Sequence, residues 1–246
     1  MTKNRFKRIL LKVGGESMMG DKEYGIDPKA ARKVAEKIKR IYSKHVQISI
    51  VIGGGNIFRG LTASKNGIER ATGDYMGMLA TVMNGLALQD SLEQIEVPTR
   101  LQSAIPMSSV AENFIRRKAM RHMEKGRVVI IAAGTGVPYV TTDTGAALHA
   151  LELQCDVLMK ATKVDGIYDQ NPTNNPSAKR FKTLSFKDAI SMEKINIMDT
   201  AALAMCQEND MPIMVFKLFS ENCLEKAVEG QDIGTFVDNK VKTEFA

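Results

Sequence analysis

Short apolar runs that suit β-strands alternate with longer segments of helical pattern over most of the 246 residues. The runs contain few polar residues, which is typical of strands that are buried on both faces of a parallel sheet. Because strands and helices alternate, the sequence predicts an α/β fold, a three-layer αβα sandwich with a mainly parallel central sheet and right-handed crossovers. The expected strands are 8–13, 46–52, 99–105, 127–132 and 156–161, with weaker ones near 183–186, 213–216 and 234–237.

Helical segments fill the intervals between these strands. The first opens with Asp27, which is expected as the N-cap, and with Pro28 at the first helical position. Gly126 is placed to end the third helix. We expect one domain, residues 1–246, with an N-terminal lobe of about 1–160 and a C-terminal lobe of about 161–246. The expected helices are 27–45, 74–95, 108–125, 143–154, 199–209 and 220–229.

The composition restricts the class of protein. Hydrophobic residues make up 44% and charged residues 25%, and the net charge of +6 favours anionic partners such as nucleotides, nucleic acid or a membrane surface. The three cysteines form no C-x-x-C pair, so a reducing cytoplasm is expected and neither a disulfide framework nor a zinc site is indicated. We expect no signal peptide, because Lys12 interrupts the first apolar run, and no membrane span.

Glycine-rich or polar loops follow four of the expected strands. In an open parallel sheet, ligands bind beyond the carboxyl ends of the strands. One such loop is as easily explained by a tight turn, but four at one edge predict a phosphate or nucleotide site. The three contiguous glycines at 53–55 match neither the P-loop nor the dinucleotide fingerprint. The four loops are 12–16, 53–60, 133–143 and 161–172.

Lysines near this edge are expected to supply the charge that the P-loop lysine supplies elsewhere. Lys12 interrupts an apolar run and precedes two glycines, so its ammonium group is expected to reach a phosphate held by the 53–55 amides. Lys163 can add a second cation, and Asp143, which alternatively caps a helix, can orient a lysine or Mg²⁺. Phosphoryl transfer depends mainly on positioning and charge neutralisation, and a phosphate acceptor is already mostly ionised. A kinase of this kind needs no general base.

Six segments carry a resemblance to a known family. They are LKVGGES, GGGNIFRG, TGDYMGMLATVMNGLAL, AGTGVPYVTTDTGAAL, KATKVDGIYDQNP and IMDTAALAMCQEN. The chain resembles the amino acid kinase superfamily along essentially its full length, and within it the bacterial UMP kinases. Segment 72–88 is the most discriminating, because members acting on acetylglutamate, aspartate or carbamate share the lysine and glycine loops but not this segment.

The resemblance implies Mg²⁺-assisted transfer from ATP to UMP, giving UDP, by a homohexamer that GTP activates and UTP inhibits. It implies an acceptor-binding N-terminal lobe, an ATP-binding C-terminal lobe, and catalytic roles for Lys12, Asp143 and Asp199, the last of which is alternatively a helix cap. The implied ATP residues are Lys12, Val13, Gly14, Gly15, Gly55, Arg59, Thr162, Lys163, Tyr168 and Asn171. The implied UMP residues are Gly54, Asp74, Thr135, Gly136, Val137, Pro138, Tyr139, Val140, Thr141 and Thr142. The implied GTP residues are Gly20, Asp21, Lys22, Glu23, Tyr24 and Gly25.

Two positions depart from the family's pattern. Gly14 stands where the family usually has Ser, which removes a hydroxyl but keeps the backbone N–H, so the loop is still expected to bind phosphate. Asn171 stands where the family usually has Asp, which weakens the case for a carboxylate there. The apolar pattern of 75–92 covers more than one helical face and indicates either a subunit contact or a helix buried between sheet and lobe.

Two alternative functions remain open. One is a superfamily enzyme that acts on a carboxylate or carbamate. The other is a non-catalytic regulator that binds nucleotides or nucleic acid, motivated by the net charge and the basic run 116–127. That run is also explained as the solvated face of a helix, and it lacks the interleaved aromatic residues that stack on bases.

Overall fold

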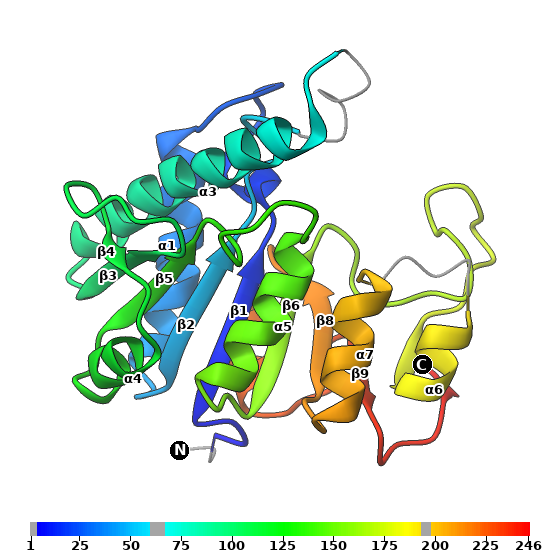
Figure 1. Cartoon of the computed structure of the whole chain (residues 1–246). Helices are drawn as coiled ribbons and strands as arrows, with labels where there is room; N and C mark the ends of the chain where they lie inside the picture. Colours follow the sequence, from blue (N-terminus) through cyan, green and yellow to red (C-terminus); the bar gives the residue numbers. More distant parts are fainter. Residues whose placement is uncertain (1–3, 60–66, 193–197) are drawn as a thin grey trace.

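The computed structural model describes residues 4–59, 67–192 and 198–246. Its ten strands form one sheet in the order β10-β7-β9-β8-β6-β1-β2-β5-β3-β4. Its centre, with β2, β1, β6 and β8 side by side, is visible in the side view (Figure 1). All neighbours are parallel except β8 with β9 and β10 with β7. The strands are β1 (Arg8–Val13), β2 (Gln47–Ile52), β3 (Thr99–Ser103), β4 (Glu112–Asn113), β5 (Val128–Ala132), β6 (Val157–Thr162), β7 (Phe181–Ser185), β8 (Ile213–Lys217), β9 (Thr235–Asp238) and β10 (Glu244–Phe245). The eight expected strands are confirmed, and among the described strands only the two-residue strands β4 and β10 lie outside the predictions.

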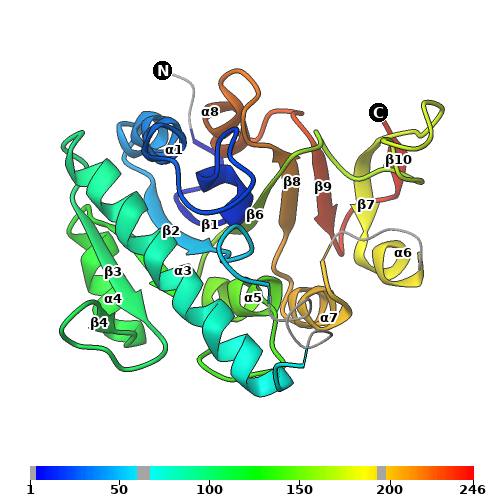
Figure 2. The ribbon, with the colours of Figure 1, turned by 90° about the horizontal axis from the view of Figure 1, so that it is seen from above.

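Helices cover both faces of the sheet. Seen from above, α1 and α8 lie on one side, and α5, α6 and α7 lie on the other (Figure 2). Asp27 caps α1 by accepting from the Lys29 amide at 3.1 Å, and Gly126 follows α4 with φ of +69°, as predicted. The bounds are η1 (Gly15–Met18), α1 (Pro28–Tyr42), α3 (Arg70–Glu93), α4 (Arg116–Glu124), α5 (Thr142–Glu152), α6 (Phe186–Ser191), α7 (Thr200–Glu208) and α8 (Cys223–Val228).

Alternate residues of the central strands belong to two separate cores, which is the signature of three layers. Ile9 and Leu11 of β1 are buried together with Val34 of α1. Leu10, between them, is buried on the opposite face together with Ala146 of α5. The near-continuous apolar runs of the sequence therefore reflect burial on both faces, as predicted.

The prediction of one helix over 108–125 is wrong in its first half. Residues 108–110 form a turn, Glu112–Asn113 form β4 beside β3, and α4 begins only at Arg116. The Glu112 carboxylate accepts from Gln102 of β3 at 3.1 Å and lies 3.0 Å from His122 Nε2. These tertiary contacts outweigh a local helical pattern, which is only a weak determinant.

The topology brings the four glycine-rich or polar loops together. Strands β6, β1, β2 and β5 are consecutive in the sheet and mutually parallel, so the loops that follow them leave the same edge. The predicted convergence of the four loops at one edge of the sheet is confirmed. The division into two lobes near residue 160 stays a prediction. In the described residues, no helix combines the length and the apolar character that crossing a bilayer requires.

Candidate active site

Two lysines on neighbouring strands share one carboxylate at this edge. Lys12 of β1 and Lys160 of β6 are register partners, so their side chains leave the sheet on the same side. Asp143, in the first turn of α5, lies 2.8 Å from Lys12 Nζ through Oδ1 and 2.7 Å from Lys160 Nζ through Oδ2. Each oxygen of the Asp143 carboxylate is therefore paired with a different ammonium group. The lysine side chains are 13% exposed and that of Asp143 is 15% exposed, so the cluster is largely shielded from water.

Burial and charge act in opposite directions on this cluster. Burial raises the pKa of Asp143, but the ammonium groups of Lys12 and Lys160 outweigh it and hold the pKa below its ordinary value. Burial lowers the pKa of Lys160, although the Asp143 carboxylate opposes this effect. Asp143 is therefore ionised at neutral pH and holds together two cations that would otherwise repel each other. Such concentrated positive charge is what a transferring phosphoryl group requires.

Asp199 supports the beginning of α5. It is the N-cap of α7, and its Oδ1 accepts from the Ala202 amide at 2.9 Å and from the Thr144 hydroxyl at 2.7 Å. The Thr141 hydroxyl donates to Asp199 Oδ2 and itself accepts from the Asp143 amide at 3.1 Å. The alternative of a helix cap is confirmed for Asp199, and its catalytic role stays a prediction. Through Thr141 and Thr144, Asp199 fixes the turn that carries Asp143.

The glycines of the site have two different roles. A Cβ at Gly15 would lie 2.3 Å from Asn56 Oδ1, and one at Gly54 would lie 2.7 Å from a backbone oxygen of α3. Close packing therefore explains these two positions. A Cβ at Gly14 would meet nothing within 4 Å, and one at Gly55 would meet only an arginine side chain, at 3.6 Å. Gly14 and Gly55 therefore border open space, where a ligand can approach the backbone closely.

A cavity of 640 Å³, called here the α3 cavity, lies between the glycine loops, α3 and the loop that precedes α5. Its volume suits a nucleotide-sized ligand. Thr135 Oγ1 is buried there without a hydrogen-bond partner among the described residues, which is unusual for a buried polar atom. The predicted residues on its wall are Lys12, Gly14, Gly15, Gly54, Gly55, Arg59, Asp74, Thr135, Val140, Thr141 and Thr142.

Asp74 joins α3 to the loop on the other side of this cavity. Its carboxylate accepts from Arg70 Nε at 2.9 and 2.8 Å and from the Tyr139 amide at 2.8 Å. The Arg70 guanidinium carbon lies 5.4 Å from the centroid of the Tyr139 ring. The remaining predicted UMP residues, Gly136, Val137, Pro138 and Tyr139, are in this loop but do not line the cavity.

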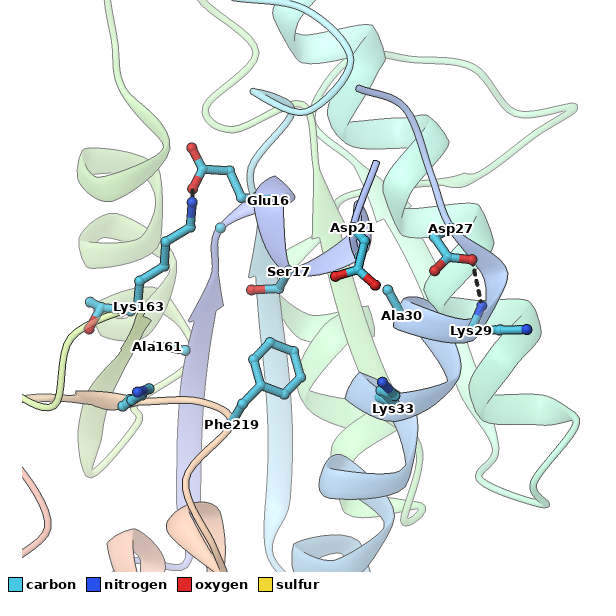
Figure 3. A pocket seen from close by; sticks show the side chains of 14 residues that line it. Glu16, Ser17, Asp21, Asp27, Lys29, Ala30, Lys33, Ala161, Lys163 and Phe219 are labelled. Carbon is cyan, nitrogen blue, oxygen red and sulfur yellow. Dashed lines mark hydrogen bonds and ion pairs between the residues drawn. The ribbon is translucent and has the colours of Figure 1, made fainter. Parts of the chain in front are cut away.

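A second cavity of 590 Å³, called here the α1 cavity, lies on the other side of the first glycine loop, against α1 and the ends of β6 and β8 (Figure 3). Gly14 and Glu16 line both cavities. Lys163 and Phe219 are on the wall of the α1 cavity, and the Glu16 carboxylate points towards the Lys163 ammonium group (Figure 3). The predicted residues on its wall are Gly14, Thr162 and Lys163 from the ATP set and Gly20 and Asp21 from the GTP set.

Several predicted residues lie in neither cavity. Val13 is buried in the core. The Tyr168 hydroxyl donates to Asp165 at 2.6 Å, and Asn171 Oδ1 accepts from the Thr173 amide at 3.0 Å within its own turn. Residues 22–25 of the predicted GTP segment also lie outside both cavities.

The sequence reasoning missed three residues of the site. Lys160 interrupts the apolar run of β6 just as Lys12 interrupts that of β1, and this shared pattern would have identified it. Glu16 and Arg70 carry no such signal, because a single charged residue in a polar loop or at a helix start is ordinary.

Known proteins with a similar sequence or structure are kinases. The model of the amino acid kinase family matches residues 7–217. A UMP kinase structure from Bacillus anthracis superposes with a TM-score of 0.94 at 32% identity, covering 98% of this chain and 99% of that chain. A UMP kinase from Ureaplasma parvum gives 0.89 at 36% identity over 95% and 99%, and a uridylate kinase from Archaeoglobus fulgidus gives 0.71 at 25% over 93% and 99%. The chain belongs to the amino acid kinase family.

Proposed function

We propose that the protein transfers the terminal phosphoryl group of ATP to UMP and releases ADP and UDP. The observation that carries the proposal is the Lys12–Asp143–Lys160 cluster at the meeting point of the glycine loops. The similarity to three UMP or uridylate kinases over nearly the whole chain supports the choice of acceptor.

The proposed mechanism is direct transfer assisted by charge. The phosphate of UMP is mostly ionised at neutral pH, so the attacking oxygen needs no base. Lys12 and Lys160 stabilise the charge on the transferring group and on the leaving oxygen, while Asp143 holds both ammonium groups in place. The open backbone at Gly14 and Gly55 lets their N–H groups approach phosphate oxygens.

The acceptor is proposed to occupy the α3 cavity and the donor to approach from the side of β6. The unpartnered Thr135 hydroxyl would hydrogen-bond the base, and Asp74 would contact the ribose or the loop that covers it. The predicted ATP residue Thr162 ends β6, and Lys163, Tyr168 and Asn171 follow it along the chain, on the proposed donor side of the cluster. Their individual roles remain part of the proposal.

Mg²⁺ is proposed to arrive with ATP. No group of three or more metal-ligating side chains occurs within residues 4–59, 67–192 and 198–246. A donor set of that size is not required, because Mg²⁺ usually keeps several waters and binds through nucleotide phosphates with one or two carboxylates. When bound, the ion would neutralise charge on the donor phosphates.

Self-association through α3 is proposed as the first step to a homohexamer. Tyr75, Met76, Leu79, Met83 and Leu86 of α3 are large apolar side chains that remain exposed in the single chain, at helical spacing. An apolar stripe of this extent is typical of an interface. Activation by GTP and inhibition by UTP belong to the same proposal, with the segment Gly20 to Gly25, of which residues 22–25 lie outside both cavities, as the candidate effector contact.

The nucleic-acid alternative is not favoured, because two cations of the basic run 116–127 are paired with carboxylates of the chain. Lys118 lies 3.0 Å from Glu112, and Arg121 lies 3.1 Å from Glu124. These pairs reduce the number of cations that α4 offers to phosphates, and the run contains no Phe, Tyr or Trp side chain that could stack on bases.

Replacement of Lys12 by Ala tests the mechanism. Loss of one preorganised charge contact in the transition state is expected to cost ~3–4 kcal/mol, or about 10²–10³ in rate. UDP formation from ATP and UMP would be measured by ion-exchange chromatography, with circular dichroism to verify the fold. A folded variant with near-normal turnover would contradict the proposal.

A further inference from the structure

We propose that Glu16 is an internal competitor of the donor's phosphate groups, a carboxylate that occupies the cations Arg59 and Lys163 until the nucleotide displaces it. The inference rests on the proposed function and goes beyond it, because it assigns to Glu16 a role in setting donor affinity.

Glu16 joins two loops that come from different strands. Its Oε1 lies 2.7 Å from Arg59 Nη2, in the loop after β2, and its Oε2 lies 2.6 Å from Lys163 Nζ, after β6. Each oxygen therefore serves one cation, and the second of these pairs is visible in Figure 3. The residue lines both the α3 cavity and the α1 cavity, so it lies at the boundary between the proposed acceptor and donor sides.

Arg59 lines the α3 cavity and Lys163 lines the α1 cavity, on the two sides of the glycine loop that is proposed to bind phosphates. Arg59 Nε also donates to Gly55 O at 3.0 Å, which holds the guanidinium group over a glycine with open space beside it. Over the described ranges, Glu16 is the only carboxylate paired with either cation. Carboxylate and phosphate oxygens accept from guanidinium and ammonium groups in the same way, so a polyphosphate that takes the N–H donors now bound to Glu16 must displace its carboxylate.

The charge state and exposure of Glu16 suit displacement. The hydrogen bond from Lys163 outweighs burial and holds the pKa of Glu16 below its ordinary value, so the carboxylate is ionised at neutral pH. Its side chain is 36% exposed and its partners are 61% and 77% exposed, so the pairs are weak enough to exchange.

The ion pairs are not needed to hold the local backbone. The turn at η1 is closed by the Ser17 amide, which donates to Gly14 O at 3.0 Å. Gly15 is locked by its close approach to Asn56, which leaves no room for a side chain. Asn56 is itself held by Asn84, through contacts of 3.0 and 2.7 Å. Neutralising Glu16 should therefore leave the fold unchanged while freeing the two cations.

The test is Glu16→Gln, which keeps the shape of the side chain and removes its charge. Binding of MgATP, and separately of inorganic tripolyphosphate, would be measured by calorimetry at low ionic strength without acceptor. Release of two exposed ion pairs is expected to tighten binding of both probes by about two- to tenfold. Glu36→Gln is the matched control, because Glu36 has an exposed ion pair of 3.1 Å with Arg32 on α1. The control should leave both affinities unchanged.

A double-mutant cycle with Lys163→Gln separates competition from a merely structural effect. In the unchanged protein, Lys163 must first leave Glu16, so Lys163→Gln should weaken ATP binding only slightly. In the Glu16→Gln background the same substitution should weaken binding several-fold more. Glu16→Ala, with thermal unfolding as a check, provides a second variant that should also bind more tightly.

The outcomes distinguish this inference from the proposed function. If the unchanged protein binds ATP and makes UDP but Glu16→Gln and Glu16→Ala bind ATP equally or more weakly, the competitor role is overturned and the kinase remains. If the unchanged protein binds neither MgATP nor tripolyphosphate, both the proposed function and this inference are contradicted.

Discussion

Replacement of Asp143 by Asn removes the carboxylate that pairs with both Lys12 and Lys160. The two ammonium groups, at 2.8 and 2.7 Å from the carboxylate, would face each other in a shielded site. Removing one partner from a buried ion pair costs about 3–5 kcal/mol. Because none of the three side chains is fully buried, we expect the free energy of unfolding to fall by about 3 kcal/mol, at the lower end of this range.

The pH dependence of this loss follows from the direction of the pKa shifts. The pKa of Asp143 is depressed in the folded state, so its stabilisation is present above the ordinary carboxylate pKa of about 4 and is lost as the pH falls through the depressed value. In the variant, the Asp143 carboxylate no longer opposes the lowering of the Lys160 pKa by burial, and only the weaker effect of the Asp199 carboxylate remains to raise it. Raising the pH towards the ordinary lysine pKa of about 10 removes that proton, so part of the lost stability should return.

Urea unfolding followed by circular dichroism at pH 7 and at about pH 9.5 measures both effects. Asp232→Asn is the control, because Asp232 is 47% exposed and pairs with Lys182 only at 3.5 Å. A loss below about 0.5 kcal/mol for Asp143→Asn, or a loss equal at both pH values, would refute the reasoning.

Three further predictions concern binding and assembly. Thr135→Val removes a buried hydroxyl without a partner, so the free energy of unfolding in urea should be nearly unchanged. The same substitution should raise KM for UMP about tenfold, and an unchanged KM would argue against contact between Thr135 and the acceptor. Met83→Glu places a charge on the exposed apolar stripe of α3 and should shift the protein towards monomers in sedimentation. An unchanged oligomeric state would show that the stripe is not an interface. Asn171→Asp should change KM for ATP less than about twofold, because the Asn171 side chain accepts from the Thr173 amide within its own turn. A marked gain in Mg²⁺ affinity would instead show that a charge at this position matters.

The architecture was predictable because its determinants are local and repeated. Burial on both faces makes strands such as Ile9 to Val13 almost purely apolar, and the alternation with capped helices specifies a parallel sheet. The convergence of the four loops followed from that topology. The start of α4 was not predictable, because Glu112 is held in β4 by Gln102 and His122, which lie ten residues before and after it and beyond the reach of a local helical pattern.

The site was predictable only where residue type and position agree. Lys12 is conspicuous because a lysine inside an apolar strand is costly, whereas Lys160 was overlooked although the same argument applies. The role of Glu16 could not be predicted from the sequence, because it depends on ion pairs with Arg59 and Lys163, which follow two different strands. The roles of the individual glycines could not be predicted from the sequence, because close packing explains Gly15 and Gly54, whereas Gly14 and Gly55 face open space.

The central claim is that this chain phosphorylates UMP. The most direct test is a coupled assay of ADP release with UMP, CMP, dCMP and N-acetylglutamate in parallel, with ATP and Mg²⁺ present. A site whose buried polar groups match uracil should reject cytosine strongly, because an unmatched buried hydrogen-bonding group is costly. We expect kcat/KM for UMP to exceed that for every other acceptor by at least about 10²-fold. Comparable efficiency with CMP, or preference for N-acetylglutamate, would contradict the account and leave only membership of the family.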